Sequence, residues 1–513
     1  MHRVAGTAIL AAVLVSLVPG RAADPTADEL LQAVEQKLKT VTETAGPSVA
    51  CVVVSRSDRY PKPANPEHAG QLGGFDPQGF ARADPTPTRI ELARKLDLSN
   101  RENIPDNSSA GGVVIDPAGL VLTTYYAIEG ATKVYVHLPG GKGSYADIHA
   151  ADARSDLAVL KLLSPPPGLR AISIGEARTT DRVGGQPRNV FSGKLVVLMA
   201  YPYSSGFQMQ PTTWLGSIGN IVRSQSRDRK NSVLNRSWYL YGWVLEFSTL
   251  LQPGGKGGVA PALVENGMPV LGLDGHLLGL TTTMAAVVGN PPGPVYALPI
   301  DPKVRRIVDV LRRGEEVEYG FLGVSMSQDR LQIEVTPRGP AAAAGLQSGD
   351  QIMHIDGEPV DSYEDLLLHA GTALAGSRIS VQARSRTADR EAVVVTLGKF
   401  KNEAPFIASK RPEPVFGLRV DYNSIMAQTV GDNNGRGIPP GVVVRELAPN
   451  SPAAAKFKTL GDNPNRWLIT AVNGTATPTP AEFYKAVRGQ ASVRLTFTDP
   501  TETNPTAREL TLP

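Results

Sequence analysis

Residues 111–131 read GGVVIDPAGLVLTTYYAIEGA, and this stretch decides the fold. Two short runs of β-branched and apolar residues flank the turn at Pro117–Gly119, a pattern that predicts a β-hairpin. Further strands are predicted at Lys133–Leu138 and Leu157–Leu162. Because short strands and turns continue over roughly 190 residues, we predict a mainly β fold, with barrels or a sandwich pair rather than α/β units.

The residues that precede the hairpin predict an export signal, a helix, a strand and an insertion. Residues 1–22 carry positive charge, an apolar run and small residues at a cleavage site, which indicates a signal peptide; the alternative is an uncleaved anchor. A helix is predicted at Thr26–Thr44 and a strand at Ser48–Ser55. Residues 56–108 are rich in Pro, Gly and charge, which predicts a long surface insertion. We therefore expect a soluble protein that is exported to the periplasm or secreted, with no stable membrane span after cleavage.

Composition excludes several classes of function. The chain has 513 residues, enough for about three or four domains. Its 52 basic and 49 acidic residues leave a formal charge of +3, so no charge excess points to nucleic acid as a partner. Cys51 is the single cysteine, which excludes an intramolecular disulfide, and we expect it to be a small buried hydrophobic residue. The seven histidines show no metal-ligand spacing, so we expect neither metal nor cofactor.

The C-terminal part of the chain contains a degenerate internal repeat. FLGVSM at Phe321–Met326 is echoed by VFGLRV at Val415–Val420. In both copies a Pro-Ala-rich segment, a strand that ends in a turn and a short helix follow in the same order. These motifs are GPAAAAGL, IMHIDG and SYEDLLLHA in the first copy, and SPAAAKF, LITAVNG and PAEFYKAV in the second. A repeat of about 90 residues has the size of a small domain.

The loop that opens each copy has a physical use in peptide binding. A glycine between apolar residues lets main-chain N–H groups approach a carboxylate, and the strand that follows can accept an extended peptide at its edge. The alternative is a tight turn without a ligand. The first copy is expected to be the better site, because the segment Asp421–Pro440 of the second is expanded. The candidate peptide-binding residues are Phe321, Leu322, Gly323 and Val324 in the first copy, and Phe416, Gly417 and Leu418 in the second.

Five motifs in order resemble the HtrA/DegP family of exported serine proteases. They are the hairpin sequence quoted above, DARSDLAVLKL, QPGGKGG, VYALPID and YGFLGVSM. The resemblance implies a trypsin-like double β-barrel of two six-stranded barrels, followed by two PDZ domains. It places the protease-like domain at residues 23–315, the first PDZ domain at 316–400 and a divergent second PDZ domain at 401–513.

The family's catalytic triad is degenerate in this sequence. Tyr126 occupies the position of the family's histidine base, and Lys256 occupies the position of its serine nucleophile. Asp156 matches the orienting acid. By resemblance, the oxyanion loop is formed by Gly254, Gly255 and Lys256. A hydroxyl nucleophile needs a base, a tyrosine hydroxyl is a poor base at neutral pH, and a lysine amine does not form a readily hydrolysed ester.

These departures predict a catalytically inactive pseudoprotease. It would bind peptides or unfolded segments through its PDZ domains and act as a scaffold or chaperone-like regulator in protein quality control. A buried, unpartnered carboxylate is costly, so we expect Asp156, Tyr126 and Lys256 to point into one small site. There the Lys256 ammonium and the Tyr126 hydroxyl would satisfy the Asp156 carboxylate.

Two other functions remain open from the sequence. An active endopeptidase with a rearranged site would need a hydroxyl beside Lys256, or a serine such as Ser248 beside His137 or His149. The two histidines are expected to lie at the surface or to serve packing instead. A structural subunit of an HtrA-like homo-oligomer is the third possibility. The resemblance implies a trimer, to which the helix at Thr26–Thr44 could contribute.

Overall fold

The structure is a computed structural model that carries side chains. Residues 1–22 and most of the predicted insertion lie outside the part of the chain that it describes. The described residues are 26–56, 98–99, 109–178, 182–183, 186–187, 189–201, 211–223, 243–247, 251–253, 259–261, 265–282, 295–326, 332–385, 391–402, 405–430, 437–461 and 463–513.

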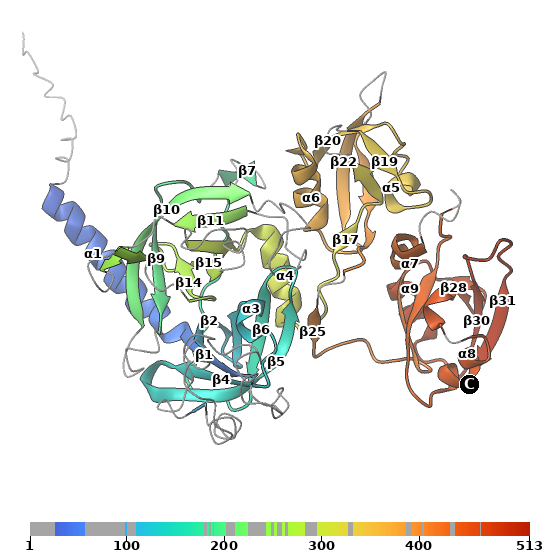
Figure 1. The fold of residues 1–513 in the computed structure, drawn as a ribbon, viewed down its shortest axis with the longest axis horizontal. Coiled ribbons are helices and arrows are strands. Elements are labelled where there is room, and N and C mark those ends of the chain that lie inside the picture. Colours follow the sequence, from blue (N-terminus) through green and yellow to red (C-terminus); the bar gives the residue numbers. More distant parts are fainter. Residues whose placement is uncertain are drawn as a thin grey trace, which may run out of the picture.

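The first described element is the helix α1 (Ala27–Ala45), which confirms the helix predicted from the sequence. Thr26 caps it, since its hydroxyl accepts from the Glu29 N–H while the Glu29 carboxylate accepts from the Thr26 N–H. The helix extends away from the barrels, and only Val41 and Ala45 near its C-terminal end are buried (Figure 1).

The first barrel is a closed ring of six antiparallel strands in the order β5-β4-β1-β2-β3-β6, with β6 paired back to β5. The predicted hairpin at Pro117–Gly119 is confirmed: Gly119 adopts a φ of +93°, which glycine tolerates without strain. Cys51 is buried on β1, as expected. The strands are β1 (Val49–Ser55), β2 (Ser109–Asp116), β3 (Leu120–Thr123), β4 (Lys133–Leu138), β5 (Lys142–Asp152) and β6 (Leu157–Leu162), with the short helix α3 (Tyr125–Ile128) after β3.

The second barrel closes in the order β10-β11-β16-β15-β14-β9. The helix α4 (Pro302–Arg312) follows it, with Asp301 accepting from the first N–H groups of the helix. The buried face of α4 belongs to one core shared with residues of both barrels, which fixes the barrels against each other. The strands are β9 (Leu195–Ala200), β10 (Thr212–Arg223), β11 (Trp243–Phe247), β14 (Pro269–Leu271), β15 (Leu277–Thr282) and β16 (Val295–Pro299), with short paired strands β7 (Arg182–Val183), β8 (Gln186–Pro187), β12 (Leu251–Pro253) and β13 (Val259–Pro261).

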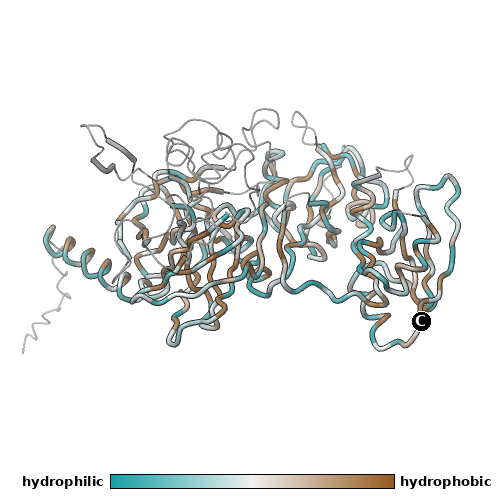
Figure 2. Tube along the Cα trace, turned by 60° about the horizontal axis from the view of Figure 1, so that its bottom comes forward, coloured by the Kyte–Doolittle hydropathy of each residue, from teal (hydrophilic) through white to brown (hydrophobic). Residues whose placement is uncertain are grey.

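Two smaller modules follow the barrels, each with its own hydrophobic core. Figure 2 shows hydrophobic segments concentrated inside the barrels and both modules, while α1 alternates between hydrophilic and hydrophobic turns. The first module contains β17 (Gly320–Phe321), β18 (Val324–Met326), β19 (Ile333–Val335), α5 (Pro340–Ala343), β20 (Gln351–Ile355), β21 (Glu358–Pro359), α6 (Tyr363–Gly371), β22 (Arg378–Arg384), β23 (Val393–Thr396) and β24 (Gly398–Lys399).

The second module repeats the order of the first. The helices α5 and α8, the strands β20 and β28, and the helices α6 and α9 fall on the repeated motifs, which confirms the order predicted for the repeat. The extra helix α7 lies in the expanded segment of the second copy. The elements are β26 (Leu418–Tyr422), α7 (Asn423–Val430), β27 (Val442–Leu447), α8 (Pro452–Lys458), β28 (Leu468–Val472), β29 (Thr475–Ala476), α9 (Pro480–Val487), β30 (Val493–Thr498) and β31 (Arg508–Leu512).

The segment between the two modules returns to the first barrel, which the sequence did not indicate. Its strand β25 (Phe406–Ala408) pairs with the end of β5, so that Phe406 lies opposite Asp152 (Figure 1). Beyond the strand, the Lys410 N–H donates to the Gly314 carbonyl over 2.8 Å. The chain that carries both modules is therefore joined to the two six-stranded barrels at two points. One is the segment after α4, which precedes the first module, and the other is β25, which lies between the modules.

Candidate functional site

Asp156 sits in the turn between β5 and β6, with its carboxylate held by two hydrogen bonds. The Tyr126 main-chain N–H donates to Oδ1 over 2.9 Å, and the Thr282 hydroxyl donates to Oδ2 over 2.7 Å. The Asp156 carbonyl also accepts from the Tyr125 N–H over 3.1 Å. Asp156 adopts a φ of +55°, a left-handed conformation that Asp and Asn tolerate better than most residues. Asp156 therefore makes hydrogen bonds to both barrels, because Tyr126 belongs to the first barrel and Thr282 is the last residue of β15 in the second.

The environment of Asp156 favours its protonated form. The carboxyl is buried, and burial raises its pKa from 3.8 to about 7, although the hydrogen bonds from Thr282 and the Tyr126 N–H favour the charged form. The carboxyl therefore keeps its proton to a higher pH than an exposed aspartate does. Sequence reasoning missed Thr282. The available signal was the run Thr281–Thr283, which follows the apolar segment Leu277–Leu280.

Tyr126 lies in the helix α3, and the structure corrects the role expected for its hydroxyl. Its neighbours Tyr125, Ala127 and Ile128 are buried, whereas Tyr126 is 39% exposed. The main chain of the first helical turn faces Asp156, so the N–H of Tyr126 reaches the carboxylate. The hydroxyl that satisfies Asp156 is that of Thr282, not that of Tyr126.

The predicted oxyanion loop with Gly254, Gly255 and Lys256 lies outside the described residues. The strands on either side of it pair, with Pro253 opposite Val259. The expected approach of the Lys256 ammonium to Asp156 stays a prediction.

The two histidines considered for a rearranged site are buried, with hydrogen-bond partners beside both ring nitrogens of His149 and beside Nε2 of His137. His137 Nε2 lies 3.0 Å from the Leu98 carbonyl oxygen. His149 lies 3.2 Å from the Arg312 carbonyl oxygen through Nε2 and 2.9 Å from the Ser409 hydroxyl through Nδ1. Burial lowers the pKa of His149. The hydrogen bond between Ser409 and His149 therefore joins the segment after β25 to the first barrel. Ser248, the serine considered for a rearranged site, lies outside the described residues.

The loop of the first module presents main-chain N–H groups without internal acceptors. Its carbonyls are engaged: Leu322 O accepts from Ala341 and Gly323 O from Thr336, each over 2.9 Å. Within the described residues, the N–H groups of Leu322 and Gly323 have no protein acceptor. Gly323 adopts a φ of +78°, and a Cβ there would lie 3.0 Å from Pro340. The loop therefore leaves two main-chain N–H groups available, and carboxylate binding there stays a prediction.

The strand that follows this loop has an open edge. In the described part of the chain, β18 pairs with β19 alone, with Val324 opposite Val335. Its second edge can therefore accept an added strand.

The corresponding loop of the second module is closed on itself. Leu418 N–H donates to the Val415 carbonyl over 2.8 Å, and the reverse bond measures 3.0 Å. Phe416 and Gly417 both have positive φ, the pattern of a tight two-residue turn. A Cβ at Gly417 would lie 2.0 Å from the Ser451 hydroxyl oxygen, so this loop packs against the start of α8 as the first loop packs against the start of α5.

The edge of β26 beyond this second loop has one contact with a side chain of α9. The Val420 N–H lies 3.4 Å from the Tyr484 hydroxyl of α9, in a position where an added peptide strand would bond. The Leu418 N–H, expected from the sequence to bind peptide, is already satisfied within the loop.

The described part of the chain contains neither a candidate metal site nor a candidate membrane span. No group of three or more His, Cys, Asp or Glu side chains there could hold a metal ion. None of the helices there combines the length and apolar character needed to cross a membrane.

Comparisons with known proteins match both the barrels and the first module. The family described as trypsin-like peptidase domain matches residues 110–263, and the family described as PDZ domain matches residues 320–397. Among solved structures, the HtrA-type protease AlgW with decapeptide is 20% identical, with 74% of this chain and 99% of that chain covered and a TM-score of 0.43. The serine endoprotease from Yersinia pestis is also 20% identical, with 71% and 98% covered and a TM-score of 0.39.

Curated relatives are similar over most of the chain. A probable periplasmic serine endoprotease DegP-like of Pseudomonas fluorescens is 25% identical over 499 residues, which cover 93% of this chain and 91% of the relative. A protein of the same description from Brucella suis is 24% identical over 430 residues, with 81% and 74% covered. The periplasmic serine endoprotease DegP of Salmonella typhimurium is 25% identical over 399 residues, with 74% and 72% covered. The chain is thus an HtrA/DegP family protein, built from a trypsin-like double barrel and a PDZ domain.

Proposed function

We propose that this chain is an exported HtrA/DegP-type pseudoprotease that binds the C-termini of peptides or unfolded protein segments. One observation carries the proposal: the acid of the triad is fully built, but tyrosine and lysine stand where a base and a nucleophile are needed. Asp156 is anchored by Thr282 and by the main chain of Tyr126. Without an imidazole, this acid has no base to orient.

The replacement residues do not offer an alternative route to hydrolysis. A serine-type mechanism needs a hydroxyl, a base that removes its proton and donors that stabilise the oxyanion. An oxyanion hole without the triad retains only about 10³–10⁴-fold acceleration over water. We therefore expect the protein to capture polypeptides without cleaving them.

The peptide site is proposed at the loop Phe321–Val324 of the first module. The support is the pair of N–H groups of Leu322 and Gly323 that have no acceptor within the described residues, beside the open edge of β18. A peptide carboxylate would accept from the loop, and the peptide chain would add to β18 as a strand.

Hydrolysis of casein or of a labelled peptide by the purified mature protein tests the proposal. We expect no turnover by the native chain and measurable turnover by the Tyr126→His, Lys256→Ser double variant, because the anchoring of Asp156 is retained. Each single variant is the matched control, since each lacks one member of the triad. Turnover that is equally present in a mock purification from cells without the chain would identify a contaminating protease. Turnover that requires the native chain, whether or not it is lost in Asp156→Ala, would overturn the pseudoprotease proposal.

Assembly into a homo-oligomer, with a trimer implied by the family resemblance, is a further part of this proposal. The support is α1, which extends from the barrels and exposes Leu30 and Leu31. Light scattering on the mature chain and on a Leu30→Ser, Leu31→Ser variant tests it. A native chain that is monomeric at micromolar concentration would overturn this part.

A further inference from the structure

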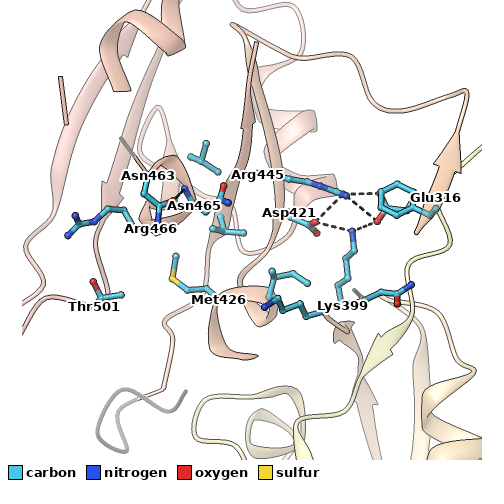
Figure 3. Close-up of a pocket in the computed structure, with 15 residues that line it drawn as sticks. Glu316, Lys399, Asp421, Met426, Arg445, Asn463, Asn465, Arg466 and Thr501 are labelled. Atoms are coloured by element: carbon cyan, nitrogen blue, oxygen red, sulfur yellow. Dashed lines mark hydrogen bonds and ion pairs between the residues drawn. The ribbon is translucent and has the colours of Figure 1, made fainter. Parts of the chain in front are cut away.

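A largely buried cluster of five charged side chains lies where the two C-terminal modules meet (Figure 3). Lys399 is at its centre, with its side chain only 5% exposed. Its Nζ atom lies 2.9 Å from a carboxylate oxygen of each of Glu316, Glu318 and Asp421. Arg445 completes the cluster, 2.9 Å from Glu316 and 3.2 Å from Asp421.

The members of the cluster come from three separate parts of the chain. Glu316 and Glu318 lie between α4 and β17, in the segment that connects the barrels to the first module. Lys399 ends the first module on β24, whereas Asp421 and Arg445 belong to β26 and β27 of the second module. The ion pairs therefore join the connecting segment, the first module and the second module at one point.

Two of the five ion pairs, Lys399–Asp421 and Arg445–Glu316, form only when the modules are docked. Burying an ammonium or a carboxylate without a partner is strongly unfavourable, and removal of one partner from a buried pair is far more costly than loss of an exposed pair. Burial opposes the charge of Lys399, but the carboxylates of Asp421, Glu318 and Glu316 outweigh it and raise the pKa of the ammonium. The cluster thus favours one relative orientation of the modules.

Main-chain contacts from α7 reinforce the same junction. The Ser424 hydroxyl accepts from the Lys399 N–H over 2.9 Å and donates to the Lys399 carbonyl over 2.8 Å. The Gln428 side chain donates to the same carbonyl and accepts from the Lys401 N–H, each over 2.9 Å. The helix α7 lies in the expanded segment of the second copy. This segment therefore contributes contacts to the junction of the modules, a role that is separate from peptide binding.

A cavity of about 700 Å³ adjoins the cluster, lined by both modules. Figure 3 shows Lys399, Asp421 and Arg445 on one side of it, and Asn463, Asn465 and Arg466 on the other. Because the last strand of the first module forms part of its wall, the cavity has this shape only in the docked arrangement.

We propose that the second module is an intramolecular docking module, whose surface of β26, α7 and β27 binds the end of the first module and the segment that connects that module to the barrels. It thereby fixes the orientation of the first module relative to the barrels. The closed loop at Val415–Leu418 fits this role, since the module does not need a free carboxylate-binding loop. This inference is independent of catalysis and of peptide binding.

Single-molecule energy transfer between the modules tests the proposal on the full mature chain. Dyes on Val394→Cys and Lys458→Cys, both exposed positions, report the distance between the modules in a Cys51→Ala background. An excess of unlabelled chain removes transfer between copies in an oligomer. We expect one narrow peak for this chain and loss of that peak, with a broad low-transfer population, when Lys399→Met is added.

A matched control and a second variant make the result decisive. Arg494→Met removes an exposed ion pair with Glu509 within the second module and should leave the peak unchanged. Lys399→Met could unfold the first module, which a loss of near-ultraviolet circular dichroism would reveal. In that case the energy-transfer distribution of the Gln428→Ala variant tests the proposal instead. This variant removes the bonds of Gln428 to Lys399 and Lys401 without leaving a buried charge unpaired, and we expect it to broaden the peak. An unchanged narrow peak in folded Lys399→Met, or in Gln428→Ala where that variant decides, would overturn the proposal.

Discussion

The Thr282 hydroxyl donates to Asp156 Oδ2 across the boundary between the two barrels, over 2.7 Å. This bond links the end of β15 in the second barrel to the turn after β5 in the first. The contact between the two barrels therefore fixes the position of this buried carboxyl. In the proposed function, Asp156 is the retained acid of a triad in which Tyr126 replaces the base.

The raised pKa of Asp156 predicts a specific dependence of stability on pH. A carboxyl with a folded-state pKa of about 7 and an ordinary value of 3.8 binds more protons in the folded state between these values. Stability from this group is therefore present below about pH 4 and is lost as pH rises towards 7. Asp156→Asn cannot ionise and tolerates the positive φ, so it should be more stable than the native chain at pH 8, by up to roughly 4 kcal/mol.

Urea unfolding of both proteins from pH 4 to pH 8 measures this difference. The two curves should converge near pH 4, where the native carboxyl is protonated. A difference that stays constant over the whole range would contradict the raised pKa.

Loss of the Thr282 hydroxyl should destabilise the chain mainly when Asp156 is charged. Thr282→Val leaves one buried carboxylate oxygen without its donor, which costs about 1–3 kcal/mol, and more for a charged acceptor. Urea unfolding at pH 8 and pH 5 should show the larger loss at pH 8. Thr459→Val is the control, because its hydroxyl makes an exposed bond to the Lys456 carbonyl, and its effect should stay within about 0.5 kcal/mol at both pH values. Equal losses in the two variants would argue against a special role for Thr282.

The local elements of the fold could be predicted because local patterns encode them. Short runs of apolar residues predicted the strands at Lys133–Leu138 and Leu157–Leu162, and apolar residues at three- and four-residue steps predicted the helix α1. The pairing of β25 with β5 could not be predicted, because Phe406 and Asp152 are distant in sequence and Phe406–Ala408 is too short to carry a periodic signal. Pairing partners of such short strands are decided by tertiary packing.

The candidate site was predictable in its residue types but not in its contacts. The resemblance of the motifs predicted that Asp156 and Tyr126 lie in one site, and the structure brings them together, since the Tyr126 N–H donates to the Asp156 carboxylate. Thr282 was missed because its contact depends on how the barrels pack. The closed turn at Val415–Leu418 was missed because positive φ at Phe416 is not visible in the sequence.

Peptide binding should occur at one site per chain. The first loop has free N–H groups among the described residues, whereas Leu418 N–H is bonded within the second loop. Isothermal titration with a decapeptide that ends in a free carboxylate should give a stoichiometry of one, and the amidated peptide should not bind. A stoichiometry of two would mean that the second loop opens in solution.

Gly323→Trp should abolish this binding, because at a φ of +78° its side chain would collide with Pro340 and displace the loop that carries the N–H groups. Gly345→Trp is the matched control: it is a glycine of positive φ in the same module, and no atom lies within 4 Å of the position that a Cβ would take there. Binding that persists in Gly323→Trp, or that is lost equally in Gly345→Trp, would show that this loop does not bind the peptide carboxylate.

The charged cluster at the junction of the modules predicts a thermodynamic coupling between Lys399 and Asp421. The native cluster has three acids and two bases, a net charge of −1, and Lys399→Met changes this to −2 in a largely buried site. We expect a loss of about 3–5 kcal/mol in unfolding free energy, because breaking a buried pair leaves charges uncompensated. Adding Asp421→Asn returns the net charge to −1, so the double variant should be less destabilised than the sum of the two single variants.

Because Lys399 and Asp421 are shielded from solvent ions, the coupling measured in a double-mutant cycle should be nearly the same at low and high salt. The exposed pair of Arg494 and Glu509 should instead show coupling below about 1 kcal/mol that salt removes. Additive single effects for Lys399 and Asp421 would mean that the two side chains do not share a buried site in solution.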